Sequence, residues 1–365
     1  MKNKIAFLIF IISLLFGNNF IYAKVTGPCV NCHTMHNSQN GVEVIAGGPY
    51  GILLVNNCIG CHTGTNTGTN TTPYVYSTSE PVFGTNTLAG GNFYWVTTDD
   101  TKGHNVFIDN DDNNLSAAPG DQGLAYCSTN SCHANLNRPV SNSGFSNLDG
   151  RQGCTKCHMV TTNGYPKGYH HANDGTGTKF VNSASQGWYR FLAGHIAGGG
   201  KGVIGIEHEK WNYGATASSH NEYSGYVYYG SFGFDAQDYP QRYTTTAYCT
   251  GCHGLFHIDQ RIGDEVAGNP WSRHPSDAII PNTGEYASIS TTYNPMVPVA
   301  RDVNTFNWAG GPSSTVTPGS DMVMCLSCHV AHGSPYPDLL RWDYSTMIAG
   351  GGSSGGCFTC HTQKK

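Results

Sequence analysis

The sequence predicts a chain that is mostly irregular coil, with short helices and few strands. Two observations lead to this prediction. The 365 residues include 47 glycines, and Gly, Asn, Ser and Thr dominate stretches that show neither long helical periodicity nor sustained alternation of apolar residues. The 14 cysteines fall into seven pairs, and histidine directly follows each pair. This pattern favours an interior organised around bound groups instead of a large apolar core.

Individual elements are expected at only a few places. Short helices are predicted at the cysteine pairs and at residues 188–195 and 337–347, and a strand at residues 226–234. Residues 63–87, rich in Thr, Gly and Asn, are predicted to form a surface excursion. No composition change marks a boundary, so residues 24–365 are expected to form a single domain.

The N-terminus has the pattern of a secretory signal peptide. Lys2 and Lys4 precede an apolar run over residues 5–16, and Ala23 offers a small residue for cleavage. The run is too short to span a bilayer comfortably, and no later stretch is apolar for long enough. We therefore predict that residues 1–23 are removed and that the mature protein is exported, without a membrane span.

The cysteine spacing identifies the bound group. Six pairs fit C-x-x-C-H, and the third, in CSTNSCH, has four residues between its cysteines. One such motif is also compatible with a zinc or redox site, but seven with no cysteine left over indicate covalent haem c. In chain order the sites are Cys29, Cys32 and His33 (one); Cys58, Cys61 and His62 (two); Cys127, Cys132 and His133 (three); Cys154, Cys157 and His158 (four); Cys249, Cys252 and His253 (five); Cys325, Cys328 and His329 (six); Cys357, Cys360 and His361 (seven).

Helical geometry explains this spacing. Positions i, i+3 and i+4 share one face of a helical turn, so two thiols and an imidazole reach one porphyrin together. Each histidine of the motif is then the proximal ligand of its iron. Site three needs a wider loop, and its His133 is still correctly placed. The sequence thus predicts seven covalently attached haems in a haem-cored multihaem cytochrome c.

The remaining histidines are numerous enough to complete every iron. Of 17 histidines, seven are proximal ligands, and the other ten are His36, His104, His170, His171, His195, His208, His220, His257, His274 and His332. Methionines such as Met35, Met159 and Met324 are alternative sixth ligands that would raise the reduction potential. The surplus of histidine in a chain with only 12% charged residues favours imidazole on both sides of each iron.

His36 is restricted by its distance from His33 along the chain. In a helical segment the two leave the same face about 5–6 Å apart. Because His33 occupies one side of its iron, the porphyrin blocks His36 from the other side. His36 therefore serves a different iron or none. His332 repeats this arrangement after His329, and His257 lies four residues beyond His253.

The charge balance excludes one class of partner. The formal net charge is −5, it becomes −7 when Lys2 and Lys4 are removed, and the haem propionates make it more negative. Binding of nucleic acid requires a basic surface, so it is not expected.

Several phrases around the haem motifs resemble one protein family. They are CVNCHTMHNSQNG, SHNEYSG at residues 219–225, WSRHPSD at residues 271–277 and CLSCHVAHGSPYPDLLRWDYS at residues 325–345. They resemble the extracellular multihaem cytochromes that polymerise into conducting filaments, the cytochrome nanowires of the S and E types. The resemblance covers both ends and the C-terminal half, and hardly touches residues 63–122.

The resemblance implies a set of distal ligands. By motif these are His36, His220, His274 and His332, and by their Gly-His contexts also His104 and His195. His171 is preferred over His170 as the seventh distal ligand, His208 is expected to be unligated, and His257 is the first alternative to these ligands. The resemblance further implies a homopolymer in which His36 ligates a haem of the adjacent protomer. The alternative is that His36 ligates the second haem of its own chain.

Electron transfer is the predicted function, with no enzymatic activity, in a protein that is secreted to the extracellular space or cell surface. The resemblance implies long-range transport along a filament to redox partners and external acceptors. One alternative is a monomeric periplasmic shuttle, and a second is a multihaem reductase of oxyanions or nitrogen compounds. A reductase needs an open coordination position, which ten spare histidines make unnecessary. The sequence also has no C-x-x-C-K motif of the kind that supplies a lysine ligand in nitrite reductases.

Overall fold

A computed structural model describes residue 25 and residues 27–50, 53–108, 118–119, 136–137, 153–158, 161–162, 165–166, 170, 179–193, 202–226, 243–253 and 274–365. The predicted signal peptide and site three lie outside these residues. The described chain is mostly coil, which confirms the predicted fold class. Its longest helices have five residues and its longest strand has four. Each described helix is too short to cross a lipid bilayer.

The helices are single turns. The α-helices are α2 (Cys58–His62), α3 (Thr245–Cys249) and α5 (Cys325–Cys328). The 3₁₀ helices are Cys29–Asn31, Trp95–Thr97, Asp100–Lys102, Gly153–Lys156, Tyr189–Phe191, Gly284–Tyr286, Trp308–Gly310, Pro337–Leu339, Tyr344–Thr346 and Gly356–Thr359.

A six-stranded sheet organises the C-terminal half, in the order β5-β6-β7-β9-β10-β8. Its strands are β5 (Phe180–Val181), β6 (Gly205–Ile206), β7 (Glu222–Gly225), β8 (Ala278–Ile279), β9 (Ala300–Asp302) and β10 (Met322–Val323). Within this sheet β7 and β9 pair in parallel, with Tyr223 opposite Ala300, and the other described strand pairs are antiparallel. Tyr223, Ala300 and Met322 form an apolar cluster with Tyr189, Val203 and Met324. Met324 packs in this cluster, and its role as an alternative sixth ligand stays a prediction. A second pair, β3 (Thr161–Thr162) and β4 (Tyr165–Pro166), lies apart from this sheet.

A buried ionic cluster lies within the same sheet. Arg301 is 2% exposed, and its Nε donates to Oε1 of buried Glu222 at 2.9 Å. Its Nη1 pairs with Asp321, and its Nη2 donates to the carbonyl of Thr315 at 2.8 Å. Buried charges require such partners, because the loss of hydration is otherwise uncompensated. Arg301 therefore links β7 and β9 to the segment that leads into β10.

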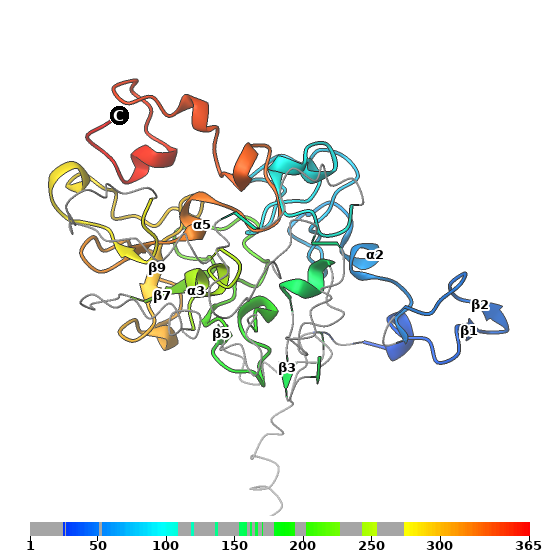
Figure 1. The fold of residues 1–365 in the computed structure, drawn as a ribbon. Coiled ribbons are helices and arrows are strands. Elements are labelled where there is room, and N and C mark those ends of the chain that lie inside the picture. The colour runs from blue at the N-terminus through cyan, green and yellow to red at the C-terminus, as the bar shows by residue number, and fades with distance from the viewer. Residues whose placement is uncertain are drawn as a thin grey trace, which may run out of the picture.

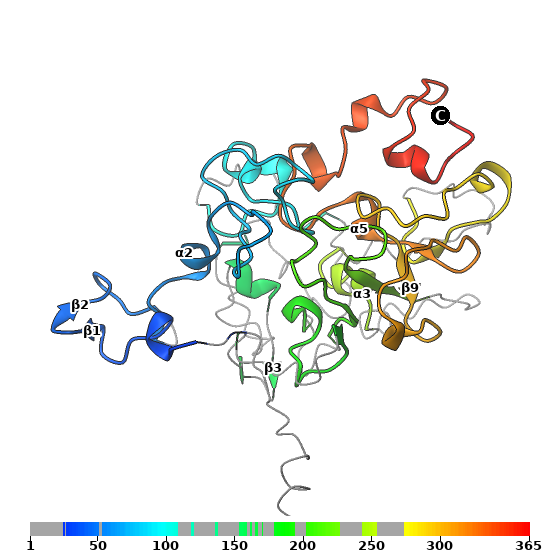
Figure 2. The ribbon, with the colours of Figure 1, turned by 180° about the vertical axis from the view of Figure 1, so that it is seen from behind.

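The N-terminal segment forms an arm that projects from the body of the molecule (Figures 1 and 2). It carries a hairpin in which β1 (Ser38–Gln39) pairs with β2 (Val42–Glu43). Asn40 and Gly41 close the hairpin with φ angles of 54° and 78°. A two-residue turn with positive φ at both positions strongly favours Asn-Gly, which matches the twist of the flanking strands. The hairpin is therefore encoded locally.

The Thr- and Gly-rich segment at residues 63–87 is irregular, as predicted, but it is anchored. Asn66 is 1% exposed and donates from Nδ2 to the carbonyls of Tyr74 at 2.8 Å and Asn86 at 3.1 Å. Ser77 is also buried and donates to the carbonyl of Gly64 at 2.9 Å. Hydrogen bonds from side chains to backbone carbonyls therefore hold this segment, which has no regular secondary structure.

Two predicted helices are wrong. Residues 188–193 contain only the 3₁₀ turn Tyr189–Phe191, and residues 337–347 contain two separate 3₁₀ turns. The chain turns left-handed at Arg190 (φ 49°) and at Asp338 (φ 59°), and a continuous right-handed helix excludes this conformation. The predicted strand at residues 226–234 is wrong at Tyr226, which follows the end of β7, and its other residues lie outside the described chain.

Candidate haem sites

Each of the six described haem motifs contains or directly follows a short helical turn, as predicted. In five of them the backbone N–H of the histidine donates to the carbonyl of the first cysteine, four residues earlier. The pairs are His33–Cys29 at 2.8 Å, His158–Cys154 at 2.8 Å, His253–Cys249 at 3.0 Å, His329–Cys325 at 3.0 Å and His361–Cys357 at 3.0 Å. This hydrogen bond brings the thiols and the imidazole of a motif to one face. The twelve described cysteines form no disulfide with one another, which leaves their thiols available for haem.

The proximal imidazoles are oriented by hydrogen bonds at Nδ1. Four of them meet a backbone carbonyl: His62 that of Pro73 at 2.8 Å, His158 that of Arg190 at 2.8 Å, His253 that of Pro119 at 2.7 Å and His329 that of Asp338 at 2.7 Å. A carbonyl only accepts, so Nδ1 carries the proton and Nε2 keeps its lone pair. Such an imidazole is prepared to bind a metal through Nε2.

The two residues that interrupt the predicted helices have a role at these sites. Arg190 and Asp338 adopt left-handed conformations, and their own carbonyls accept from His158 and His329. Backbone strain of this kind persists where the surrounding structure requires it. The helical segments are thus broken at the positions that orient two proximal ligands.

Four histidine pairs face each other at a distance that fits one iron. The ring centroids are 6.0 Å apart for His62 and His170, 6.2 Å for His104 and His253, 5.9 Å for His158 and His332, and 6.1 Å for His274 and His361. Two imidazoles bonded at about 2 Å on opposite sides of a metal have ring centres roughly 6 Å apart once the ring radii are added. The residues therefore fit haem with two histidine ligands at sites two, five, four and seven.

The distal histidines have environments that suit neutral ligands. Nδ1 of His104 donates to the carbonyl of Ala331 at 2.7 Å, and Nδ1 of His274 donates to that of Pro275 at 2.9 Å. Burial lowers the pKa of both. Burial, followed by the nearby His158, lowers the pKa of His332 to about 3. Burial disfavours the protonated ring, so all three keep the lone pair that iron needs.

Sites one, two, four, five, six and seven follow one another in space as well as in sequence. The side chains of Cys58 and Cys154 (sites two and four) lie next to each other, as do those of Cys249 and Cys325 (sites five and six). Tyr248, next to Cys249, donates its hydroxyl to the carbonyl of Cys157 at 2.6 Å, which connects sites four and five. Burial and the neighbouring Cys357 and Cys360 raise the pKa of Cys328 to about 12, so sites six and seven are also close. Likewise, burial and the nearby Cys32 raise the pKa of Cys61, which connects sites one and two.

His208 and His220 differ from the paired histidines. Nδ1 of His208 accepts from the N–H of Asn212 at 3.0 Å, and its Nε2 lies 3.1 Å from the hydroxyl of Ser219, so both nitrogens are engaged. His220 is buried and stacks on Tyr293 with centroids 3.6 Å apart, and its Nε2 lies 3.6 Å from Glu222. Ligation by His220 remains a prediction, because the structure gives this ring an aromatic neighbour in place of a proximal histidine.

The sequence alone does not decide between His170 and His171 as the seventh distal ligand. The ring of His170 faces His62, whereas His171 lies outside the described residues, together with His195 and His257. We therefore place His170 opposite His62. The backbone carbonyls that orient the proximal rings could not be found from the sequence, since every residue type carries one.

Residues 317–365, which contain sites six and seven, match the family model of the doubled CXXCH motif. This segment thus has the paired attachment motifs of haem c.

Two solved structures resemble the chain at low identity. The outer membrane cytochrome S filament from Geobacter sulfurreducens is 18% identical, with 90% of this chain and 86% of that chain covered and a TM-score of 0.45. A cryo-EM structure of the OmcS nanowires from the same organism is 17% identical, with 94% and 91% covered and a TM-score of 0.47. Comparison with curated protein sequences gave no match.

Haem content is directly measurable. The exported protein is expected to exceed its polypeptide mass by seven haems, because each cysteine has a place in an attachment motif. Intact-mass spectrometry checks the number, and a variant with Cys127→Ala and Cys132→Ala is expected to carry one haem fewer. An increment of six haems in the unaltered protein would remove site three.

Proposed function

We propose that this protein is a secreted seven-haem c-type cytochrome that transfers electrons along closely spaced, six-coordinate haems and assembles into a conducting extracellular filament. The observation that carries electron transfer is the set of four facing histidine pairs, 5.9–6.2 Å apart, at sites two, four, five and seven. Histidine on both sides leaves those irons no position for a substrate. The haem supplies a reversible one-electron couple, and the protein's residues fix its orientation and spacing.

This coordination distinguishes electron transfer from the alternative of a reductase. Reduction of an oxyanion at haem requires an exchangeable ligand on the iron. At sites two, four, five and seven, the second histidine is already directed at the proximal ring by its packing. His332, for example, is held between the 5.9 Å approach to His158 and a stack on Phe93 with centroids 4.6 Å apart.

Carbon monoxide tests this distinction. The dithionite-reduced filament is expected to show a low-spin optical spectrum and negligible binding of carbon monoxide at neutral pH, because each iron holds two histidines. In unassembled subunits we expect at most one binding haem in seven. Rapid binding by several haems, or a high-spin band in the assembled protein, would favour the reductase.

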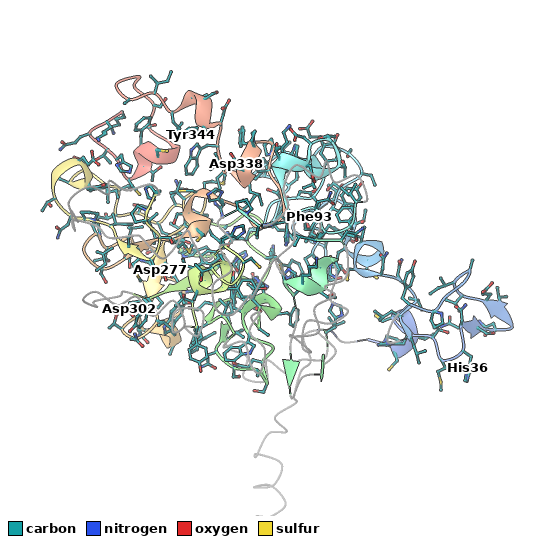
Figure 3. The ribbon with its side chains drawn as sticks, in the orientation of Figure 1. His36, Phe93, Asp277, Asp302, Asp338 and Tyr344 are labelled. Atoms are coloured by element: carbon teal, nitrogen blue, oxygen red, sulfur yellow. The ribbon has the colours of Figure 1, made fainter. Side chains whose placement is uncertain are left out.

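The arm supports assembly. His36 lies on it, exposed and far from the body in Figure 3. Large apolar side chains of the arm are also exposed, namely Val30 (54%), Met35 (78%), Val42 (67%), Tyr50 (42%) and Leu53 (46%). A cluster of exposed apolar side chains is typical of an interaction site. We propose that a second copy of this chain covers the arm.

The alternative partner for His36, the second haem of its own chain, is disfavoured. His62 already faces His170 at 6.0 Å, so both axial positions of site two have a histidine. Among the described residues, His329 is a proximal histidine that faces no other histidine ring. We therefore propose that His36 reaches the iron at site six of the next protomer. Tyr344 (69% exposed) follows site six in the chain and lies on the far side of the body from the arm (Figure 3), and together with Ile348 (62% exposed) it offers apolar surface for the arm.

Electron microscopy tests assembly directly. Purified mature protein is expected to form filaments in negative stain, accompanied by a fully low-spin optical spectrum. A protein that remains monomeric at all concentrations while its spectrum is fully low-spin would instead support the periplasmic shuttle.

A further inference from the structure

The proximal histidine of site seven differs from the others in its hydrogen bond. Of the five proximal histidines whose Nδ1 contact is described, four donate to a backbone carbonyl. His361 instead donates to the carboxylate Oε1 of Glu285 at 2.8 Å. The two residues are 76 positions apart in the chain, so the folded structure creates this contact.

Glu285 is held in place independently of its carboxylate. It lies in the 3₁₀ turn Gly284–Tyr286, and its backbone carbonyl accepts from the hydroxyl of Thr362 at 2.8 Å and from the N–H of Gln363 at 3.3 Å. The ring of Tyr286 lies 5.1 Å from that of His361. The second carboxylate oxygen pairs with Nζ of Lys364 at 3.0 Å. A change at the Glu285 side chain is therefore expected to leave the turn attached to the C-terminal segment.

A carboxylate and a carbonyl affect a metal-bound imidazole differently. A full negative charge at Nδ1–H draws the proton away from the ring and makes Nε2 a stronger donor to iron. A stronger donor stabilises ferric over ferrous iron, which lowers the reduction potential. Glutamate is ionised at neutral pH, so Glu285 supplies this charge under physiological conditions. Lys364 offsets part of it.

We propose that Glu285 makes site seven the lowest-potential centre among the five sites whose proximal hydrogen bond is described. This inference rests on the proposed haem chain, but it does not depend on filament formation. The tuned step is the one-electron reduction of ferric to ferrous iron by a neighbouring haem. No bond breaks, and the Nδ1 proton remains on His361. An electron that passes through one protomer therefore meets an uphill step at its C-terminal haem, and this step recurs once in each subunit.

The test is a potentiometric titration of the purified holoprotein, followed by electron paramagnetic resonance. The planes of His274 and His361 cross at 85°, whereas those of His62 and His170 cross at 25°. Crossed imidazole planes give a low-spin ferric signal at a higher maximal g value than parallel planes, so the signal of site seven is sought among the high-g signals, together with that of site four, whose planes cross at 63°. Glu285→Gln keeps a hydrogen-bond acceptor and removes the charge. It is expected to favour reduction at site seven about tenfold, ~59 mV for one electron.

Two further variants separate the effect of a carboxylate bonded to Nδ1 from the effect of a nearby charge that makes no such hydrogen bond. Lys364→Met removes the offsetting ammonium, so it is expected to lower the same potential. Asp338→Asn removes a carboxylate near His329, while the backbone carbonyl of residue 338 still accepts from Nδ1 of that ring. Asparagine tolerates the left-handed φ of 59° at this position. Measured in the same assembly state, Asp338→Asn is expected to shift the potential of site six by clearly less than Glu285→Gln shifts that of site seven.

Each outcome decides the matter. An unchanged potential at site seven in Glu285→Gln, an equal shift in Asp338→Asn, or a rise in Lys364→Met would overturn the proposal. If Glu285→Gln fails to fold, Lys364→Met alone still tests the sign. Intact mass provides a separate check on the proposed function. Absence of the haem at site seven would contradict the proposed haem chain, and Glu285 would then have no haem whose potential it could change.

Discussion

The His36→Ala variant is expected to form no filaments and to leave one haem per chain without its sixth ligand. His36 is exposed on the projecting arm, and His170 already faces His62 of site two. Under the proposed arrangement, the porphyrin held by His33 blocks His36 from the iron of site one. A ligand bond across an interface couples assembly to coordination, because neither subunit has a complete haem set alone. Negative-stain microscopy measures the loss of filaments. The optical spectrum and carbon monoxide binding measure the open iron.

Two controls accompany this variant. Ser38→Ala changes another exposed residue of the arm, two positions away, and is expected to assemble normally. Free imidazole added to His36→Ala is expected to restore the low-spin spectrum without restoring filaments, because it fills the iron but links no subunits. Normal filaments with an unchanged spectrum in His36→Ala would show that another residue completes the interface.

Replacement of Arg301 by methionine is expected to lower the free energy of unfolding by about 3–5 kcal/mol, the usual cost of removing one partner from a buried ion pair. The change leaves the carboxylates of Glu222 and Asp321 without their cation within the six-stranded sheet. Both are buried, so water does not replace the lost hydrogen bonds. Guanidinium chloride unfolding of the holoprotein, followed by circular dichroism, gives the difference.

Lys179→Met is the matched comparison. Lys179 pairs with Glu209 at 3.3 Å, but the two side chains are 50% and 62% exposed. Exposed ion pairs contribute roughly 0–1 kcal/mol. We therefore expect a small change for Lys179→Met, and similar effects of the two substitutions would contradict the structural importance of the buried cluster.

The haem motifs could be predicted from the sequence because the chemistry itself dictates the spacing of two thiols and a ligand on one turn. The orienting contacts could not. Pro119 accepts from His253 across 134 positions, and Ala331 accepts from His104 across 227. Such contacts use backbone carbonyls, which every residue has, so the residue type does not reveal them. Glu285 is a partial exception, since its side chain is distinctive, but nothing local connects it to His361.

The errors in secondary structure have a related cause. The segments around Arg190 and Asp338 have residues suited to helices, yet both turn left-handed where a carbonyl must meet a proximal histidine. Tertiary requirements at a ligand outweigh local helix propensity. The Asn-Gly hairpin of the arm is the opposite case, because its turn geometry is settled by the two residues in it.

The projecting arm makes the two ends of any assembly chemically unlike. Repetition of one head-to-tail contact produces a polar fibre. Under the proposed arrangement, the terminal subunit at one end displays a bare arm with a free His36, and the one at the other end displays an iron that lacks its sixth ligand. The amount of carbon monoxide bound by an assembled sample is then proportional to the number of fibres, not to the number of subunits. The amount bound per subunit falls as the fibres lengthen. A factor that extends the fibre, caps it or attaches it to a cell surface therefore binds an exposed arm at one end and an incomplete haem site at the other.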